Sequence, residues 1–163
     1  RRPSIKRPRH METKGPIIFL DFDGVITNDR WERTHESFTF DPANVAHVNR
    51  IVEATGSRIV VSSDWRRLSF DRVCNGLAGA GLKYRPIGCT PLQEPGPGSR
   101  ITRGMEIDAW LVQNQYEGVF VILDDSSEHL LEPHADRLVQ VDAEFGLTAA
   151  DADRAIALLA PRP

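Results

Sequence analysis

The sequence predicts an α/β protein, folded as a three-layer, doubly wound parallel sheet. Short apolar runs alternate with segments of helical periodicity along the 163 residues, and this alternation favours repeated strand–helix–strand units. The apolar runs stop abruptly at polar side chains, which is typical of strands buried on both faces of a sheet. Ligands of such sheets bind beyond the carboxyl ends of the strands, so these polar stops are the expected functional positions.

Strands are expected where the apolar runs occur. Residues 17–20 form the first run and follow Gly15 and Pro16, and the later runs contain β-branched residues that suit strands. A weaker fifth strand is expected over residues 82–87, before a breaker-rich loop at 91–99. The four main runs cover 17–20, 58–61, 119–123 and 138–141.

Helices are expected between these strands. Asp41 is a good N-cap and Pro42 suits the first turn of a helix over 42–55. Trp110 lies on the apolar side of a helix over 104–113 and is predicted to be a core residue. The remaining predicted helices cover 67–77, which has the weaker pattern, and 149–159, which opens with a capping box.

Composition and charge limit the classes of protein. Residues 1–15 form a basic, proline-punctuated segment, which predicts a flexible tail or a vector remnant, whereas residues 16–163 are acidic overall and predict a single domain. No run reaches the roughly 18 apolar residues of a membrane span, so no membrane partner is expected. Two cysteines, Cys74 and Cys89, do not build a disulfide scaffold. A cytoplasmic protein is therefore expected.

The strongest local signal is the segment from Asp21 to Gly24, which reads Asp-Phe-Asp-Gly. Two carboxylates directly after a buried strand are unfavourable unless a cation or hydrogen-bond donors meet them. Gly24 lets the backbone turn tightly, so that Asp21 and Asp23 can surround one point. The alternative for this segment alone is an ordinary surface turn.

Two further strands also end in polar side chains. Ser62 and Ser63 follow the second strand, and Asp124 and Asp125 follow the strand at 119–123. A cluster of carboxylates repels itself, and a divalent cation with oxygen ligands relieves that repulsion. The pattern therefore predicts a site for a divalent cation, and Mg²⁺ is the usual occupant when phosphate is also present.

With these motifs the chain resembles the haloacid dehalogenase (HAD) superfamily of phosphotransferases. Residues 19–26 look like the first motif of that family, Ser62 like the second, Arg103 like the third and Asp124-Asp125 like the fourth. The four motifs occur in the family's order between residues 17 and 126. The family more often has Lys at the third motif, which leaves nearby Arg100 as an alternative to Arg103.

The resemblance implies a role for each motif residue. Asp21 would be the nucleophile that forms an aspartyl-phosphate, and Asp23 the general acid and base. Mg²⁺ would be held by Asp21, the backbone carbonyl of Asp23, Asp125 and nearby Asp124. Ser62 would bind a transferring oxygen, and Arg103 would neutralise charge on the phosphoryl group.

The spacing of the motifs leaves little room for a cap domain. An expected helix takes up much of the gap from Asp23 to Ser62, and a helix, a strand and a loop take up most of the gap from Ser62 to Arg103. Within the superfamily, residues 62–66 and 103–111 look like the small HAD domains of bacterial and phage RNA-repair-type proteins. The resemblance implies a nucleotide or polynucleotide-end phosphate as the substrate, so the expected partner is a phosphorylated small molecule or a nucleic-acid end. The oligomeric state stays open.

Substrate contacts are expected around the predicted site. The positions assigned to substrate binding are Gly24, Ser63, Trp65 and Arg66, with Arg67 beside them at the rim. Trp65, Arg66 and Arg67 would stack a base and bind phosphate, or they are a packing tryptophan and two solvated arginines. Further candidates are Arg30, Trp31, Arg33 and His35 in the loop after the first motif, and Glu128, either a support for a metal ligand or an acid in a helix turn.

Three alternatives to a phosphatase remain at this stage. The same residues would serve a phosphotransferase that acts on a small metabolite. A non-catalytic phospho-receiver module shares the early acidic pair, but it needs a lysine after a late strand, and the last lysine here is Lys83. A third alternative keeps the fold and binds a metal or nucleotide without catalysis.

Overall fold

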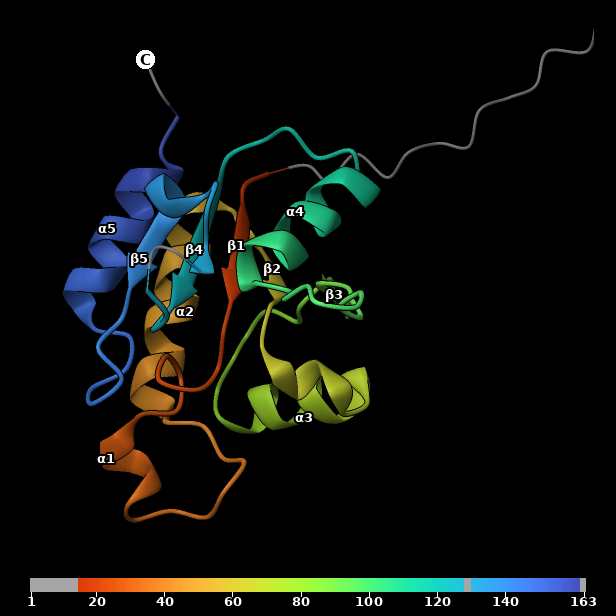
Figure 1. Ribbon diagram of the computed structural model, residues 1–163. Coiled ribbons are helices and arrows are strands. Elements are labelled where there is room, and N and C mark those ends of the chain that lie inside the picture. The colour runs from red at the N-terminus through yellow and green to blue at the C-terminus, as the bar shows by residue number, and fades with distance from the viewer. Residues whose placement is uncertain (1–14, 128–129, 162–163) are drawn as a thin grey trace, which may run out of the picture.

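A computed structural model describes residues 15–127 and 130–161, and the structural statements that follow concern this part of the chain. Five parallel strands form one sheet in the order β3-β2-β1-β4-β5 (Figure 1). The predicted parallel α/β fold is therefore confirmed. The strands are β1 (Ile17–Leu20), β2 (Arg58–Val61), β3 (Gly88–Cys89), β4 (Phe120–Asp124) and β5 (Leu138–Gln140).

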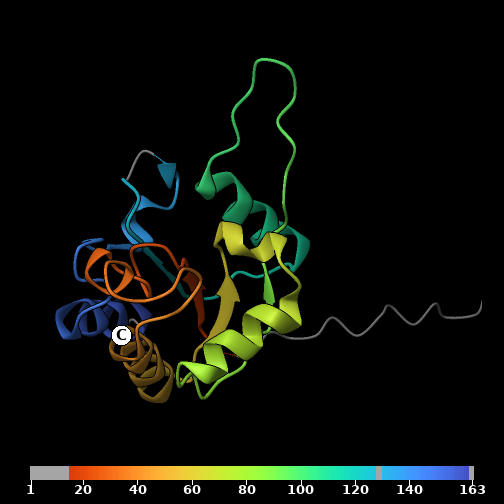
Figure 2. The same cartoon turned by 90° about the horizontal axis from the view of Figure 1, so that it is seen from below.

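Helices cover both faces of the sheet, so the protein has three layers (Figure 2). Side chains of α2, α3 and α5 pack in one core with Ile18 and Leu20, whereas α4 packs with Ile17 and Phe19 on the opposite face. The alternation follows from the pleat, which directs successive side chains of a strand to opposite faces. The helices are α1 (Asp29–Glu32), α2 (Pro42–Thr55), α3 (Phe70–Gly79), α4 (Arg103–Gln113) and α5 (Ala149–Leu159), with short 3₁₀ helices η1 (Asp64–Arg67) and η3 (Ala135–Arg137).

The predicted caps and core residues explain why these helices form. The Asp41 carboxylate accepts a hydrogen bond from Ala43 N at the start of α2, and Thr148 opens α5 with a capping box. Trp110 is buried as predicted, with its ring edge-on to Phe19 at a centroid distance of 5.4 Å. Cys74 is a buried free thiol on α3, and Cys89 is a half-buried one in β3.

Two sequence predictions were wrong in position. Residues 82–87 are not a strand, because the Asn49 side chain binds the backbone on either side of Leu82, at Gly81 O and Lys83 N, and β3 begins only at Gly88. The helix predicted over 67–77 is displaced towards the carboxyl terminus. It begins at Phe70, because the Ser69 hydroxyl accepts a hydrogen bond from Arg72 N and caps the helix there.

No cap domain lies between the motif strands. The chain between β1 and β2 forms only α1 and α2 besides loops, and the chain between β2 and β3 forms only η1 and α3. The α1 segment and the loop after it lie beyond the carboxyl ends of the strands, at the bottom of Figure 1. The loop between β3 and α4, which includes the predicted loop at 91–99, projects away from the body in Figure 2. The expected uncapped architecture is therefore confirmed.

Within the described ranges, no helix is both long enough and apolar enough to cross a membrane.

Candidate active site at the carboxyl edge of the sheet

Polar side chains from three strands lie in one row at the carboxyl edge. Leu20 of β1 is in register with Val61 of β2 and Leu123 of β4. The next residues, Asp21, Ser62 and Asp124, therefore occupy the same level, and alternation turns all three towards the face that α4 covers. Backbone hydrogen bonds continue the ladder through this row, from Asp21 N to Leu123 O at 3.0 Å and from Ser62 N to Leu20 O at 2.9 Å.

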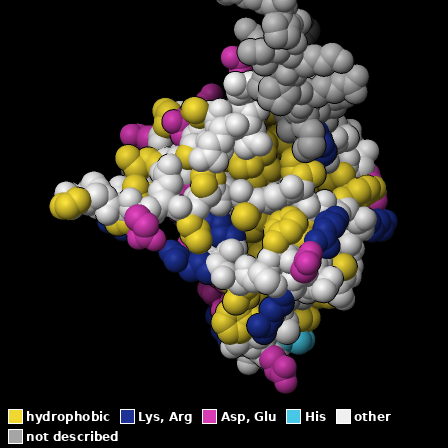
Figure 3. Space-filling view, turned by 90° about the vertical axis from the view of Figure 1, so that its right-hand side faces the viewer, with side chains coloured by type: hydrophobic (Ala, Val, Ile, Leu, Met, Phe, Trp, Pro, Cys, Tyr) yellow, Lys and Arg dark blue, Asp and Glu magenta, His cyan; other side chains and the backbone are white. Residues whose placement is uncertain are grey.

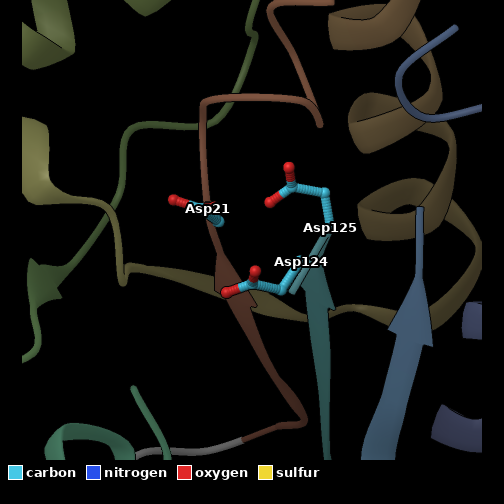
Figure 4. Close-up of side chains that lie close together, drawn as sticks. All are labelled: Asp21, Asp124 and Asp125. Carbon is cyan, nitrogen blue, oxygen red and sulfur yellow. The ribbon is translucent and has the colours of Figure 1, made fainter. Parts of the chain in front are cut away.

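Three carboxylates from this edge gather around one space. Ligand oxygens of Asp21, Asp124 and Asp125 all lie within 4.8 Å of one another, and Figure 4 shows the three side chains projecting from the ends of β1 and β4. Asp21 is 4% exposed and Asp124 is fully buried. Of the acids that the sequence placed around one point, Asp21, Asp124 and Asp125 meet, although about a hundred residues separate the first from the other two, whereas the expectation that the Asp23 side chain joins them was wrong.

The electrostatics of the cluster are unfavourable without a cation. Burial raises the pKa of Asp21 well above its ordinary value of 3.8, and repulsion from Asp124 raises it further, while Arg103 opposes the shift. Burial and the charge of Asp124 also raise the pKa of Asp125. The fold thus disfavours the charged forms of Asp21 and Asp125 relative to water, and a bound cation would favour those charged forms.

The donor set fits a hard divalent cation. All candidate ligands are carboxylate oxygens, which Mg²⁺ prefers. Asp124 Oδ1 accepts a hydrogen bond from Ser126 N at 2.8 Å, whereas its buried Oδ2 accepts none. This Oδ2 atom lies 3.4 Å from Arg103 Nε, with which it forms an ion pair. Asp23, by contrast, contributes no side-chain oxygen to the cluster.

Asp23 lies beside the cluster with its carboxylate exposed. Trp65 Nε1 donates to both of its carboxylate oxygens, at 3.1 Å each. Phe22, between the two acids, is buried and packs edge-on against Phe40 and Trp65. Alternation alone would turn Asp21 and Asp23 to the same face, but β1 ends at Leu20 and the chain turns at once. One carboxylate therefore lies in the cluster and the other at the open edge.

Gly24 is required by the close approach of Asp125. Its backbone has φ = +74°, and a Cβ atom placed there would lie 2.5 Å from Asp125 Oδ2. Glycine adopts this left-handed conformation without strain, whereas a side chain does not. The tight turn and the acid cluster thus depend on the same residue.

Gly24→Ala is expected to destabilise the protein by about 1–3 kcal/mol and to weaken Mg²⁺ binding, because the new methyl group displaces Asp125. Urea denaturation and calorimetric titration with Mg²⁺ measure the two effects. Gly98→Ala is the matched control, since Gly98 has φ = +73° with open space around the added carbon. Equal loss of Mg²⁺ affinity in both variants would contradict the steric explanation.

Arg103 is the basic residue that meets the acids. Thr102 caps the N-terminus of α4, which places Arg103 in the first turn with Nη2 3.7 Å from Asp21 Oδ1. Burial disfavours its charge, yet attraction to Asp21 and Asp124 gives a raised pKa overall. Arg100, the alternative from the sequence, is exposed, and among the described contacts none joins it to the acids. The geometry therefore favours Arg103.

Arg66 does not lie at the rim, where the sequence placed it. Its side chain is 1% exposed, because Nη1 donates to the carbonyl oxygens of Ser62 and Ser63 and Nη2 forms an ion pair with Glu106. Glu106 also lies 4.0 Å from Arg103. The buried Arg66 side chain thus joins the residues after β2 to the first turn of α4.

The other predicted positions are distributed as follows. Ser62 Oγ is buried without a hydrogen-bond partner, whereas Ser63 Oγ accepts from Trp65 N and caps η1. Arg67 is exposed. Glu128 lies outside the described residues. In the α1 region, Arg30 stacks on Phe145, Arg33 pairs with Glu144, Trp31 binds Thr39, and His35 stacks on Trp31.

Three further residues near the site were not among the positions predicted from the sequence. Thr90 follows β3 and is level with Ser62, and its buried hydroxyl also lacks a hydrogen-bond partner. It was not predicted because the strand was expected over residues 82–87 and not at 88–89. Glu106 is three residues after Arg103 on a helix, a spacing that does predict a contact. Phe38 lies next to Trp65 only through the fold, so no sequence signal marks it.

One comparison with known proteins gives a match. A family model described as "HAD domain in Swiss Army Knife RNA repair proteins" matches residues 17–152, which include β1 and every element up to the first residues of α5. No curated protein and no solved structure matched the chain.

Proposed function

Since the chain belongs to the family of HAD domains in Swiss Army Knife RNA repair proteins, we propose that it is a Mg²⁺-dependent phosphatase that hydrolyses phosphate monoesters through an aspartyl-phosphate. The family supports a phosphoesterase, and the resemblance seen in the sequence is confirmed. The observation that carries the proposal is the meeting of Asp21, Asp124 and Asp125 with Arg103 at one sheet edge.

In the first step, a carboxylate oxygen of Asp21 attacks phosphorus. An O–P bond to Asp21 forms, and the bond from phosphorus to the ester oxygen breaks. Asp23, at the open edge, gives its proton to the departing oxygen, so that an alcohol leaves. Arg103 and the Ser62 hydroxyl would bind the phosphoryl oxygens, on which negative charge is spread during transfer.

In the second step, water attacks phosphorus and Asp23 takes its proton. The O–P bond to Asp21 breaks, inorganic phosphate leaves, and both carboxyl groups return to their starting states. Asp21, Asp124, Asp125 and the backbone carbonyl of Asp23 would hold Mg²⁺, which would supply positive charge for the transfer. The nucleotide or polynucleotide-end substrate is supported by the family's description and by the uncapped site.

A substrate screen tests this proposal. Aryl phosphate, nucleotides, sugar phosphates and oligonucleotides with 5′- or 3′-phosphates are assayed for released phosphate with Mg²⁺ and with EDTA. Release that depends on Mg²⁺ is expected. Absence of release from every substrate would overturn the proposal, and transfer of phosphate to an acceptor other than water would indicate a phosphotransferase instead.

In the metal-free protein, Asp21 and Asp125 are expected to contribute stability at low pH that is lost as the pH rises through their raised pKa values. A carboxyl whose pKa is raised by folding stabilises the protein below its unfolded pKa and loses that contribution as the pH rises through its folded pKa. Asp21 and Asp125 are of this kind. Mg²⁺ binds their charged forms, so the melting temperature with Mg²⁺ should exceed that with EDTA by a margin that grows with pH. Parallel curves with and without Mg²⁺ would contradict this expectation.

A further inference from the structure

An aromatic groove of about 200 Å³ lies beside the predicted site. The groove is open on one side. Figure 3 shows the side of the molecule that is on the right in Figure 1, and hydrophobic and basic side chains lie next to one another at its lower end. The carboxyl ends of the strands lie at the same end of the molecule. The volume is smaller than the roughly 300–1,000 Å³ of a site for a drug-sized ligand, so it suits one planar ring system. The side chains that line the aromatic groove are those of Phe38, Phe40, Trp65, Leu68, Arg72 and Val73.

The aromatic groove adjoins Asp23 through Trp65, one of its lining residues. Trp65, in its wall, donates its indole N–H to both carboxylate oxygens of Asp23 at 3.1 Å. Phe22, between Asp21 and Asp23, lies edge-on to the Trp65 ring at a centroid distance of 5.6 Å. A group that leaves phosphorus on the Asp23 side therefore departs towards the groove.

Phe38 is the unusual residue of the groove. It is 72% exposed, and its backbone has φ = +63°, a left-handed conformation that is unfavourable for phenylalanine. The ring lies 5.1 Å from that of Trp65. An exposed phenyl ring in a strained turn adds little to the core, but it offers an open aromatic face beside Asp23.

We propose that the aromatic groove binds the nucleobase of the substrate, which makes nucleotides or phosphorylated polynucleotide ends the substrate class of this site. The inference rests on the proposed phosphatase function. Bases stack on aromatic side chains whatever their sequence, because every base has a π-face. Arg72 is the charged residue among the described lining residues, so the groove favours an anionic ligand and provides few groups that would distinguish one base from another.

The test compares substrates that differ only in the base. A 5′-nucleoside monophosphate and ribose 5-phosphate share the phosphate and the sugar, and a 5′-phosphorylated oligonucleotide separates free nucleotides from polynucleotide ends. The wild-type protein should prefer the nucleotide in kcat/KM. Phe38→Ala should lower this value by about 10-fold, mainly through KM, and change ribose 5-phosphate by less than about twofold. Phe38→Tyr keeps the ring and should restore the preference.

Tyr84→Ala is the matched control. Tyr84 is another partly exposed aromatic residue, but it lies near Glu53 at the end of α2, away from the acids. This variant should leave both substrates unaffected. A Phe38→Ala protein that retains the nucleotide preference would overturn the inference.

A binding measurement separates this inference from the proposed function. Saturation-transfer NMR in EDTA with a nucleoside monophosphate, where no turnover occurs, should show contacts to the base that Phe38→Ala removes. If both substrates are hydrolysed equally well and no contacts to the base are seen, the base-binding role of the groove is wrong and the phosphatase function is supported. If contacts to the base are seen but no substrate is hydrolysed, the phosphatase function is wrong and the base-binding role of the groove is supported.

Discussion

Asp21→Asn is expected to reduce turnover of an aryl phosphate by on the order of 10⁴-fold or more. The amide that replaces the carboxylate is a far weaker nucleophile, so the O–P bond of the covalent intermediate no longer forms. An acid-quenched reaction should contain phosphorylated protein in the wild type and none in the variant, as intact-mass spectrometry measures. Turnover comparable to the wild type would refute the assignment of Asp21.

The fold should survive this substitution. Burial and the neighbouring charge of Asp124 already favour a neutral group at position 21, so the metal-free variant should melt no lower than the wild type. Its stability should also depend less on pH, since one carboxyl with a raised pKa is absent. Asp153→Asn makes the same chemical change at an exposed position on α5, next to Arg50, and is expected to leave activity unchanged.

Arg103→Ala is expected to lower kcat by about 10²–10³-fold, the usual effect of removing one group that stabilises charge in a transition state. Arg103 lies 3.7 Å from Asp21 and 3.4 Å from Asp124, and no other cation among the described residues forms an ion pair with either acid. Steady-state kinetics on the aryl phosphate measure the loss. The effect should fall mainly on kcat, because charge on the phosphoryl oxygens is rearranged during transfer.

Arg100→Ala is the control that distinguishes the two arginines. Arg100 is exposed three residues earlier, and its removal should change kcat by less than about twofold. Arg103→Lys keeps the charge but loses the planar fork, so it should recover part of the activity. A large loss in Arg100→Ala together with a small one in Arg103→Ala would reverse the assignment.

Local sequence patterns predicted most of the secondary structure. Asp41 with Pro42, and Thr148 with Asp151, marked the beginnings of α2 and α5, because capping depends on a few neighbouring residues. The strand over residues 82–87 failed for the opposite reason. Asn49, more than thirty residues away, binds that backbone, and no local pattern contains such a contact.

The candidate site, too, was predicted only in part from the sequence. Asp21, Ser62, Asp124 and Asp125 were found from the sequence, since parallel strands end at one edge and carry whatever follows them to that edge. The contacts of the residues around them were not predicted. Arg66 was expected at the rim and is buried against Glu106, because an ion pair and two carbonyl oxygens outweigh its preference for water in this place.

The sequence by itself determined the parallel α/β fold and the acids that meet at its carboxyl edge, because strand periodicity and strand ends are encoded within a few residues. Only the tertiary structure decided that Arg103 rather than Arg100 approaches those acids, and that Phe38 lies beside Trp65 next to Asp23. These contacts join segments far apart in the chain. They depend on the register of the strands, on the position where each helix begins and on the path of the loops, and each of these is set by the packing of the whole domain.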